Sequence, residues 1–177
     1  MHKTPLNQEE LLSKLKNNKS VYGEKVLDVD FSGHIFDYFA DFIGLEFLKN
    51  AKFSGSAFKN EADFNGAIFT GNADFTNSFF EENADFNNAT FNGDVSFYYI
   101  QFYKEVTFVG ASFSGEGKAC FQGAQFDGDV TFEKAQFSGK KGVNFSEAKF
   151  FGGGAANFNL IKHSGEGELN FYKTEFL

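Results

Sequence analysis

The chain contains no tryptophan and no arginine, and it has one proline and one cysteine among its 177 residues. A single cysteine, Cys120, excludes an internal disulfide bond and fits a reducing compartment. No apolar run is long enough for a transmembrane helix, and the N-terminus lacks the apolar core of a secretory signal. From these absences we expect a soluble, cytoplasmic protein that does not contact a membrane.

The charge of the chain is uneven, and this limits the kinds of partner that it can bind. Residues 1–28 hold five lysines against four acids, whereas residues 29–177 hold 11 lysines against 20 acids, a net charge of −9. Phosphate binding needs clustered cations, so we do not expect direct nucleic-acid binding. The acidic surface favours a basic or cation-binding partner.

Phenylalanine is abundant, with 28 copies, and its spacing is regular. Alternating steps of five and six residues, with the longer step sometimes grown to eight, reach 26 positions, of which 25 are Phe. The positions are Phe31, Phe36, Phe42, Phe47, Phe53, Phe58, Phe64, Phe69, Phe75, Phe80, Phe86, Phe91, Phe97, Phe102, Phe108, Phe113, Phe121, Phe126, Phe132, Phe137, Phe145, Phe150, Phe158, His163, Phe171 and Phe176.

The residue two before each position is Ala, Ser, Thr or Val in 21 of the 26 cases, and the residues between are mostly polar. Steps of five and six residues do not keep side chains on one face of a helix. Turn signals about every five residues leave strands too short for an ordinary hairpin sheet. The pattern therefore predicts an all-β solenoid in which short units form the sides of stacked coils.

Units such as ADFNG, AIFTG, ADFTN, ATFNG and ASFSG resemble the pentapeptide repeat family across about residues 29–177. The resemblance implies a right-handed quadrilateral β-helix of about 6–7 coils, with four units in each coil. It also implies that each Phe and the small residue two before it point inward.

The chain departs from the strict five-residue family pattern, because alternate units carry a sixth residue. We infer that two opposite corners of the coil are wider than the other two, and that the family's tight turns do not hold there. A coil of 22 residues also predicts two Phe stacks on opposite faces. Phe31, Phe53, Phe75 and Phe97 would form one stack, and Phe42, Phe64, Phe86 and Phe108 the other.

Both ends of a solenoid core need cover. Residues 1–28 are predicted to hold a capping helix over residues 5–17, with Thr4 as its cap and Pro5 in its first turn. Leu6, Leu11, Leu12 and Leu15 would form its apolar stripe.

Residues 29–177 are predicted to form the β-helix, and no polar cap follows its last units. Phe171, Phe176 and Leu177 therefore mark an uncovered end. This final half-coil either frays or meets a second copy end to end. Some family members dimerise through C-terminal coils, and the resemblance favours a homodimer.

Two outward features are candidates for interaction. Asp41, Asp63 and Asp85 recur every 22 residues, so they form a carboxylate column that either binds a partner or hydrogen-bonds its own corner. Phe79, Tyr98, Tyr99 and Tyr103 form an aromatic patch that either contacts a partner or covers neighbouring backbone. The Gly-rich loops 114–118, 138–142 and 164–168 should stack along one corner, either as harmless bulges or as a binding rim.

The sequence shows no catalytic motif. His2 is terminal, His34 and His163 fall on inward positions, and Cys120 is expected to be an exposed free thiol. No Cys/His pair has metal-ligand spacing, no serine nucleophile motif is present, and no metal or cofactor is expected.

We therefore expect a non-enzymatic protein-interaction module. Two alternatives stay open, a structural or assembly module and a mimic of DNA that binds DNA gyrase. The second follows from the resemblance alone, because some family members bind gyrase and are linked to fluoroquinolone resistance.

Overall fold

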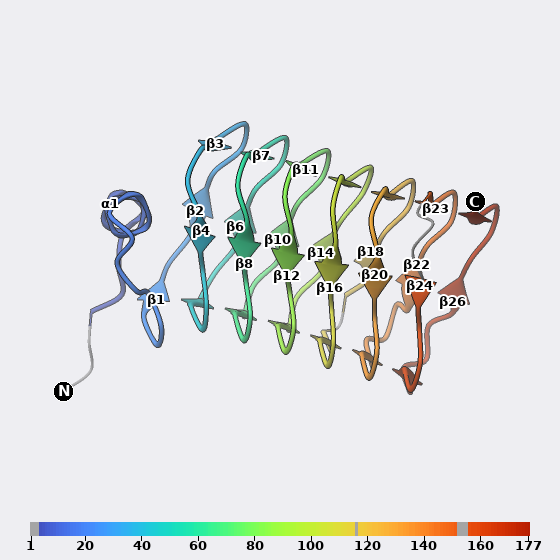
Figure 1. Cartoon of the computed structure of the whole chain (residues 1–177). Helices are drawn as coiled ribbons and strands as arrows, with labels where there is room; N and C mark the ends of the chain where they lie inside the picture. The colour runs from blue at the N-terminus through green and yellow to red at the C-terminus, as the bar shows by residue number, and fades with distance from the viewer. Residues whose placement is uncertain (1–3, 116, 152–155) are drawn as a thin grey trace.

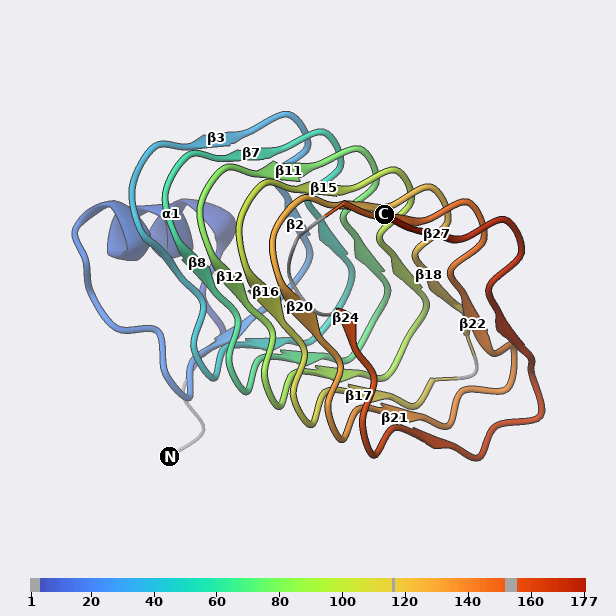
Figure 2. The ribbon, with the colours of Figure 1, turned by 45° about the vertical axis from the view of Figure 1, so that its right-hand side comes forward.

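The computed structural model describes residues 4–115, 117–151 and 156–177, which form one helix and 27 strands. The strands wind into a solenoid of about seven turns, with the helix at the N-terminal end (Figure 1). Every strand pairs in parallel with the strand one coil away, and the pairing produces four sheets, one for each side of the coil (Figure 2). The all-β solenoid predicted from the Phe spacing is confirmed.

Each sheet contributes one two-residue strand to each complete coil, and sheet D has no strand in the last, partial coil. Sheet A contains β1 (Lys25–Val26), β5 (Glu46–Phe47), β9 (Ile68–Phe69), β13 (Thr90–Phe91), β17 (Ser112–Phe113), β21 (Gln136–Phe137) and β25 (Lys162–His163). Sheet B contains β2 (Val29–Asp30), β6 (Ala51–Lys52), β10 (Ala73–Asp74), β14 (Val95–Ser96), β18 (Ala119–Cys120), β22 (Val143–Asn144) and β26 (Leu169–Asn170). Sheet C contains β3 (Ile35–Phe36), β7 (Ala57–Phe58), β11 (Phe79–Phe80), β15 (Gln101–Phe102), β19 (Gln125–Phe126), β23 (Lys149–Phe150) and β27 (Glu175–Phe176). Sheet D contains β4 (Ala40–Asp41), β8 (Ala62–Asp63), β12 (Ala84–Asp85), β16 (Val106–Thr107), β20 (Val130–Thr131) and β24 (Ala156–Asn157).

The five-residue steps make tight turns from sheet B to sheet C and from sheet D to sheet A. At Phe53, for example, the Ser56 N–H donates to the Phe53 carbonyl at 3.0 Å, and Gly55 between them has a φ of +64°. A positive φ at the third turn residue is typical of a type II turn and favours Gly or Asn.

The six-residue steps lie at the two remaining corners, which are opposite each other, as predicted. From sheet A to sheet B, side chains supply hydrogen bonds between coils. The Asn72 N–H donates to Asn50 Oδ1 at 3.1 Å, and the Asp94 N–H donates to Asn72 Oδ1 at 3.0 Å. An Asn or Asp ladder thus joins successive coils at this wider corner.

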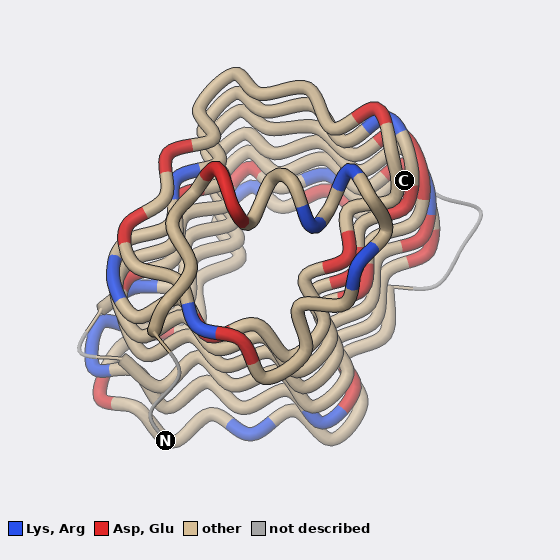
Figure 3. Tube along the Cα trace, turned by 90° about the vertical axis from the view of Figure 1, so that its left-hand side faces the viewer, with Lys and Arg blue, Asp and Glu red and all other residues tan. Residues whose placement is uncertain are grey.

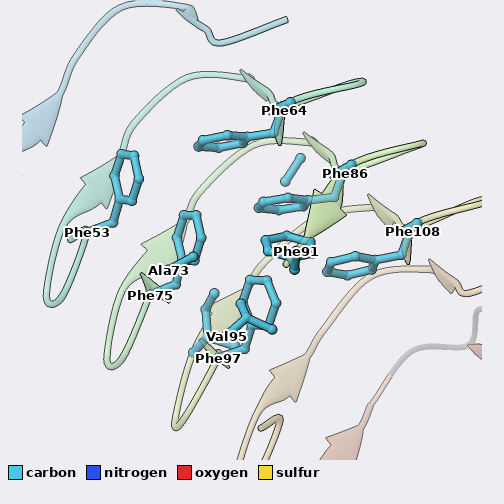
Figure 4. Close-up of a cluster of buried hydrophobic side chains, with 14 of the residues drawn as sticks. Phe53, Phe64, Ala73, Phe75, Phe86, Phe91, Val95, Phe97 and Phe108 are labelled. Atoms are coloured by element: carbon cyan, nitrogen blue, oxygen red, sulfur yellow. The ribbon is translucent and has the colours of Figure 1, made fainter. Parts of the chain in front are cut away.

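The Phe rings stack from coil to coil inside the rod. The rings of Phe53 and Phe75 lie parallel with centroids 4.7 Å apart, and those of Phe64 and Phe86 do the same at 4.8 Å. The two stacks meet edge to face along the axis, because the Phe64 and Phe75 rings are 5.6 Å apart at 88° (Figure 4). Both predicted stacks are therefore present, and stacks on sheets A and C complete the core.

The N-terminal helix, α1 (Gln8–Lys16), covers the first coil with Leu11 and Leu15 buried. The predicted start at Pro5 with Thr4 as the cap was wrong. Asn7 is the N-cap, because its side chain accepts the Glu10 N–H while the Glu10 carboxylate accepts the Asn7 N–H. This reciprocal pair satisfies two N–H groups and fixes the helix start.

The cap is also tied to the first coil by polar contacts. The Gln8 side chain accepts the Asp30 N–H at 2.7 Å and donates to the Asp30 carbonyl at 3.0 Å, as a neighbouring strand would. The Leu6 N–H donates to the Lys25 carbonyl of β1. Strand β1 itself pairs with β5, so the parallel pairing of the solenoid begins at Lys25–Val26.

Within the described part of the chain, no helix has the length and apolar character needed to cross a membrane.

The Gly-rich loops all connect sheet A to sheet B, so they stack at one corner as predicted; residue 116 lies outside the described residues. A Cβ atom on Gly139 would lie 3.0 Å from the Gly117 carbonyl oxygen and 3.1 Å from that of Gly115. The loop backbones therefore pack directly on one another, which explains the glycines without a binding role.

Two glycines are required for different reasons, one for its positive φ and the other for close packing of its backbone, and two substitutions distinguish these reasons. Gly66 has a φ of +65° and open space around it, while Asn77 and Asn88 hold the same conformation in later coils. We expect Gly66→Asn to change the free energy of unfolding by less than about 0.5 kcal/mol. A Cβ on Gly93 would lie 2.5 Å from the Gly71 carbonyl oxygen, so Gly93→Ala should cost about 1–3 kcal/mol. Urea unfolding of both variants checks this, and equal effects would contradict it.

Candidate functional site

The carboxylates of sheet D form a column along the rod. Asp41 pairs with Asp63 across β4 and β8, and Asp63 pairs with Asp85 across β8 and β12. In the next two coils the column continues with Thr107 and Thr131 instead of acids. The predicted column is thus present, but it is acidic only in the N-terminal half of the sheet.

Each of these carboxylates has a local structural task. The N–H groups of Ile43, Asn65 and Asn87 donate to Oδ1 of the Asp two residues earlier, at 3.0, 2.8 and 2.6 Å. Such a bond fixes the turn that follows. Asp41, Asp63 and Asp85 therefore do hydrogen-bond their own corners, which is one of the two roles that the sequence left open. This role uses one oxygen of each carboxylate.

A groove of about 340 Å³ opens along this column, between sheet D and the wide corner that leads into it from sheet C. The extra residue of the six-residue step places a second row of side chains beside the column. The lining residues are Phe39, Glu61, Ala62, Asp63, Asn83, Ala84, Asp85, Asn87, Glu105 and Thr107. Four are carboxylates, and none is a lysine.

The groove carries uncompensated negative charge. None of its four carboxylates makes an ion pair with the described residues, whereas acids on other sides do, such as Asp30 of sheet B with Lys52 and Glu46 of sheet A with Lys25. In Figure 3, acidic residues recur along one side of the rod in successive coils. The groove is therefore suited to a cationic group.

Asp63 lies at the centre of this charge. Burial raises its pKa above the ordinary Asp value, and the carboxylates of Asp85, Asp41 and Glu61 raise it further, while the Asn65 N–H opposes the shift. Removing a carboxylate that its neighbours repel should stabilise the fold, and an Asn can still accept the Asn65 N–H.

We therefore expect Asp63→Asn to raise the free energy of unfolding at pH 7 by a few tenths of a kcal/mol. Because the folded-state pKa is raised, the ionised form destabilises the fold as pH rises through the interval between the unfolded and folded pKa values. The gain from Asp63→Asn should accordingly vanish near pH 3, where the acid is protonated in both states. Urea unfolding at both pH values checks this, and a loss of stability at pH 7 would contradict it.

The aromatic patch is partly explained by local packing. The Lys59 ammonium lies 5.5 Å from the Phe79 ring centroid, and the Tyr103 hydroxyl donates to Gln101 at 3.1 Å. The Tyr99 ring stands over Gly123, where a Cβ would clash with it, and meets Tyr98 edge-on at 4.4 Å. Tyr99 and Tyr103 remain exposed, so both backbone coverage and an accessible surface are present.

The last coil leaves its core residues uncovered. Phe171, Phe176 and Leu177 are exposed by 37%, 59% and 65%, whereas Phe145, one coil earlier in the Phe171 stack, is fully buried. Strands β24 to β27 have no further coil beyond them among the described residues.

The histidines and the cysteine show no arrangement for catalysis or metal binding among the described residues. His34 packs between Phe31 and Phe36. His163 pairs with Phe137 and so keeps the predicted register of the inward Phe residues, but it is exposed because it lies on the last strand of sheet A. His2 lies outside the described residues. Cys120 is a free thiol, half-buried rather than exposed. The described residues contain no group of three His, Cys, Asp or Glu side chains placed to hold a metal ion.

The sequence reasoning missed Phe39, Glu61 and Glu105, which line the groove beside the Asp column. Each lies three residues before a core Phe that follows a sheet D strand, within the six-residue step that leads from sheet C to sheet D. Their 22-residue spacing was readable, since residues 39, 61, 83 and 105 are Phe, Glu, Asn and Glu.

Comparison with known proteins agrees with this architecture. Residues 53–101 and 64–112 match the family model for pentapeptide repeats (9 copies). No curated protein matches the sequence.

Proposed function

Since the chain belongs to the pentapeptide repeat family, we propose that it is a non-enzymatic protein-interaction module that binds a basic segment of a partner protein. Solenoids of this family are generally not enzymes. One observation carries the proposal: four carboxylates, Glu61, Asp63, Asp85 and Glu105, line one groove that contains no cation.

The chemistry of the groove suits a lysine or arginine side chain. Phe39, exposed by 39%, offers an aromatic surface at the N-terminal end of the groove, and an ammonium or guanidinium group is attracted to such a ring. The carboxylates follow one another along the rod axis, so an extended chain lying along the axis can present several cations in turn. Complementary charge of this kind speeds encounter and rejects acidic partners.

A direct test is the binding of short peptides measured by fluorescence anisotropy. A labelled peptide of alternating Lys and Gly should bind, and a matched peptide of alternating Glu and Gly should not. The affinity should fall as salt rises from 20 to 300 mM, because exposed charges are screened. No binding of the lysine peptide at low salt and millimolar protein would overturn the proposal.

A narrower candidate is a DNA mimic that binds DNA gyrase. The observation that favours it is the acidic column of Asp41, Asp63 and Asp85, which runs along the axis of a rod. Inhibition of gyrase supercoiling that weakens when all three become Asn would support this candidate. Undiminished supercoiling at tens of micromolar protein would exclude it while leaving the basic-segment proposal intact.

We also propose that two copies join at the C-terminal coil, because Phe171, Phe176 and Leu177 present an apolar surface there. Light scattering across a concentration series should give a dimer, and Phe176→Glu should give a monomer. A monomer at all concentrations would overturn this assembly. Growth beyond a dimer would favour a structural or assembly role instead.

A further inference from the structure

Glu24 is the only charged side chain that is buried among the described residues, with 5% of its surface exposed. Strand β1 pairs with β5 in the register Lys25 to Glu46, which places Glu24 opposite Leu45. The same inward column of sheet A then holds four fully buried alanines, Ala67, Ala89, Ala111 and Ala135. A carboxylate therefore occupies a core position that the later coils give to apolar side chains.

The helix α1 supplies a cation for this carboxylate. The Lys14 ammonium lies 3.2 Å from Glu24 Oε1, and the Lys14 side chain is 28% exposed. Leu11, about one turn before Lys14, and Leu15, directly after it, are both buried. The helix thus covers the N-terminal end of the rod with two apolar side chains and one lysine that pairs with Glu24 (Figure 1).

The end of the rod under α1 has the strand edges needed to pair with a further coil. Sheets A, B and C begin at β1, β2 and β3 and end at β25, β26 and β27. Within sheet A, the Glu46 N–H donates to the Glu24 carbonyl at 3.0 Å, and the same bond recurs between the later coils. Because the pattern repeats, the C-terminal edge of each sheet is complementary to its N-terminal edge, and two copies can stack end to end.

Two kinds of contact are open to the exposed C-terminal coil. The contact proposed above joins it to the same coil of a second copy, and this contact closes after two copies. Stacking on the N-terminal end of another copy is head-to-tail and leaves both outer ends free, so it builds a fibre. Phe171 and Phe176 are exposed and suit both contacts, so the N-terminal end decides whether a fibre forms.

We propose that Glu24 prevents the fibre by making the N-terminal end unsuitable for any cover except the chain's own α1. This inference rests on the proposed C-terminal contact, because it concerns the same exposed coil. A copy that stacks on the N-terminal end displaces α1 and with it the Lys14 ammonium. Glu24 is then buried against apolar side chains without that cation, and a buried charge that loses its partner is strongly unfavourable.

Sedimentation velocity of full-length variants tests this role. Leu11→Asp combined with Leu15→Asp should undock α1, because these two buried leucines attach the helix to the core. The undocked chain should stay no larger than a dimer. Adding Glu24→Ala should produce species beyond a dimer that grow with protein concentration, and a further Phe176→Glu should abolish them. Fibre growth in the undocked chain that retains Glu24, or no growth with Glu24→Ala, would overturn the proposal.

Glu46→Ala is the matched control for charge. Glu46 lies on the outward face of the same sheet, with its carboxylate 2.6 Å from the Lys25 ammonium. In the undocked chain Glu46→Ala should leave the size unchanged, and growth equal to that caused by Glu24→Ala would assign the effect to net charge and reject the role of Glu24. A wild-type chain that is monomeric at all concentrations overturns the C-terminal dimer alone, because growth on Glu24→Ala is measured independently.

A second measurement leaves α1 docked. Lys14→Met keeps the length of the side chain but removes this cation from Glu24. The Leu11 amide, which donates to the Asn7 carbonyl at 3.0 Å, should then exchange with solvent several-fold faster, and adding Glu24→Ala should restore its protection. Unchanged exchange in Lys14→Met would show that the buried carboxylate does not need the lysine, and the proposal would be wrong.

Discussion

Replacing Phe86 with alanine is expected to lower the free energy of unfolding by about 3–5 kcal/mol. Phe86 is fully buried, with the parallel rings of Phe64 and Phe108 4.8 and 5.0 Å away and the edges of Phe75 and Phe97 at 5.7 and 5.6 Å. The coil cannot collapse into the cavity, because its strand β12 is hydrogen-bonded to coils on both sides. The variant therefore loses its aromatic contacts and keeps the void.

Phe176→Ala is the matched control at the open end. Phe176 stacks on Phe150 at 4.8 Å but is 59% exposed, so its removal should cost less than about 1 kcal/mol in a monomer. Urea unfolding at low protein concentration compares the two. Since coils contact only their neighbours, a break in the middle also separates two halves of the rod. Similar costs for Phe86→Ala and Phe176→Ala would contradict the stacked core.

Neutralising the groove should have the largest effect on binding. The combined change Glu61→Gln, Asp63→Asn, Asp85→Asn and Glu105→Gln removes all four carboxylates without changing side-chain size. Each exposed ion pair contributes about 0.2–1 kcal/mol, so their joint loss should weaken the lysine peptide by about tenfold or more. Asn157 already fills this column and accepts the Asn159 N–H at 2.9 Å, so the fold tolerates an amide there.

The control must change net charge equally at another face. Asp28, Asp30, Asp74 and Asp94 lie on or beside sheet B, where Asn50, Asn72, Asn144 and Asn170 occupy equivalent positions. Changing those four acids to Asn gives the same net charge as the groove variant. It should leave peptide affinity within about twofold, because the changed charges lie across the rod and are screened. Equal weakening by both variants would show attraction to net charge rather than to the groove.

The fold could be predicted because the spacing of one residue type, Phe, equals the length of the coil. Phe53, Phe75 and Phe97 are 22 residues apart, so the coil length and the stacking partners follow directly from the sequence. The helix start was mispredicted because Thr4 and Pro5 suit the first turn in isolation. In the structure Asn7 and Glu10 fix the helix start instead, because each side chain accepts a hydrogen bond from the backbone N–H of the other residue.

The groove was only half predictable. The register placed Asp63 and Asp85 in one column, since strand residues one before the core Phe point outward. The 22-residue spacing of Glu61 and Glu105 was readable, but their turn toward that column was not, because the path of the six-residue corner depends on backbone hydrogen bonds between coils.

We propose that a basic segment binds at sheet D rather than over the acidic rod as a whole. Mapping the amide chemical-shift changes as the lysine peptide is added would locate the bound segment. We expect the changes to gather at residues 61–65, 83–87 and 105–107, with little change at Asp30 or Asp74. Changes spread around all four sheets, or centred on sheet B, would contradict the claim.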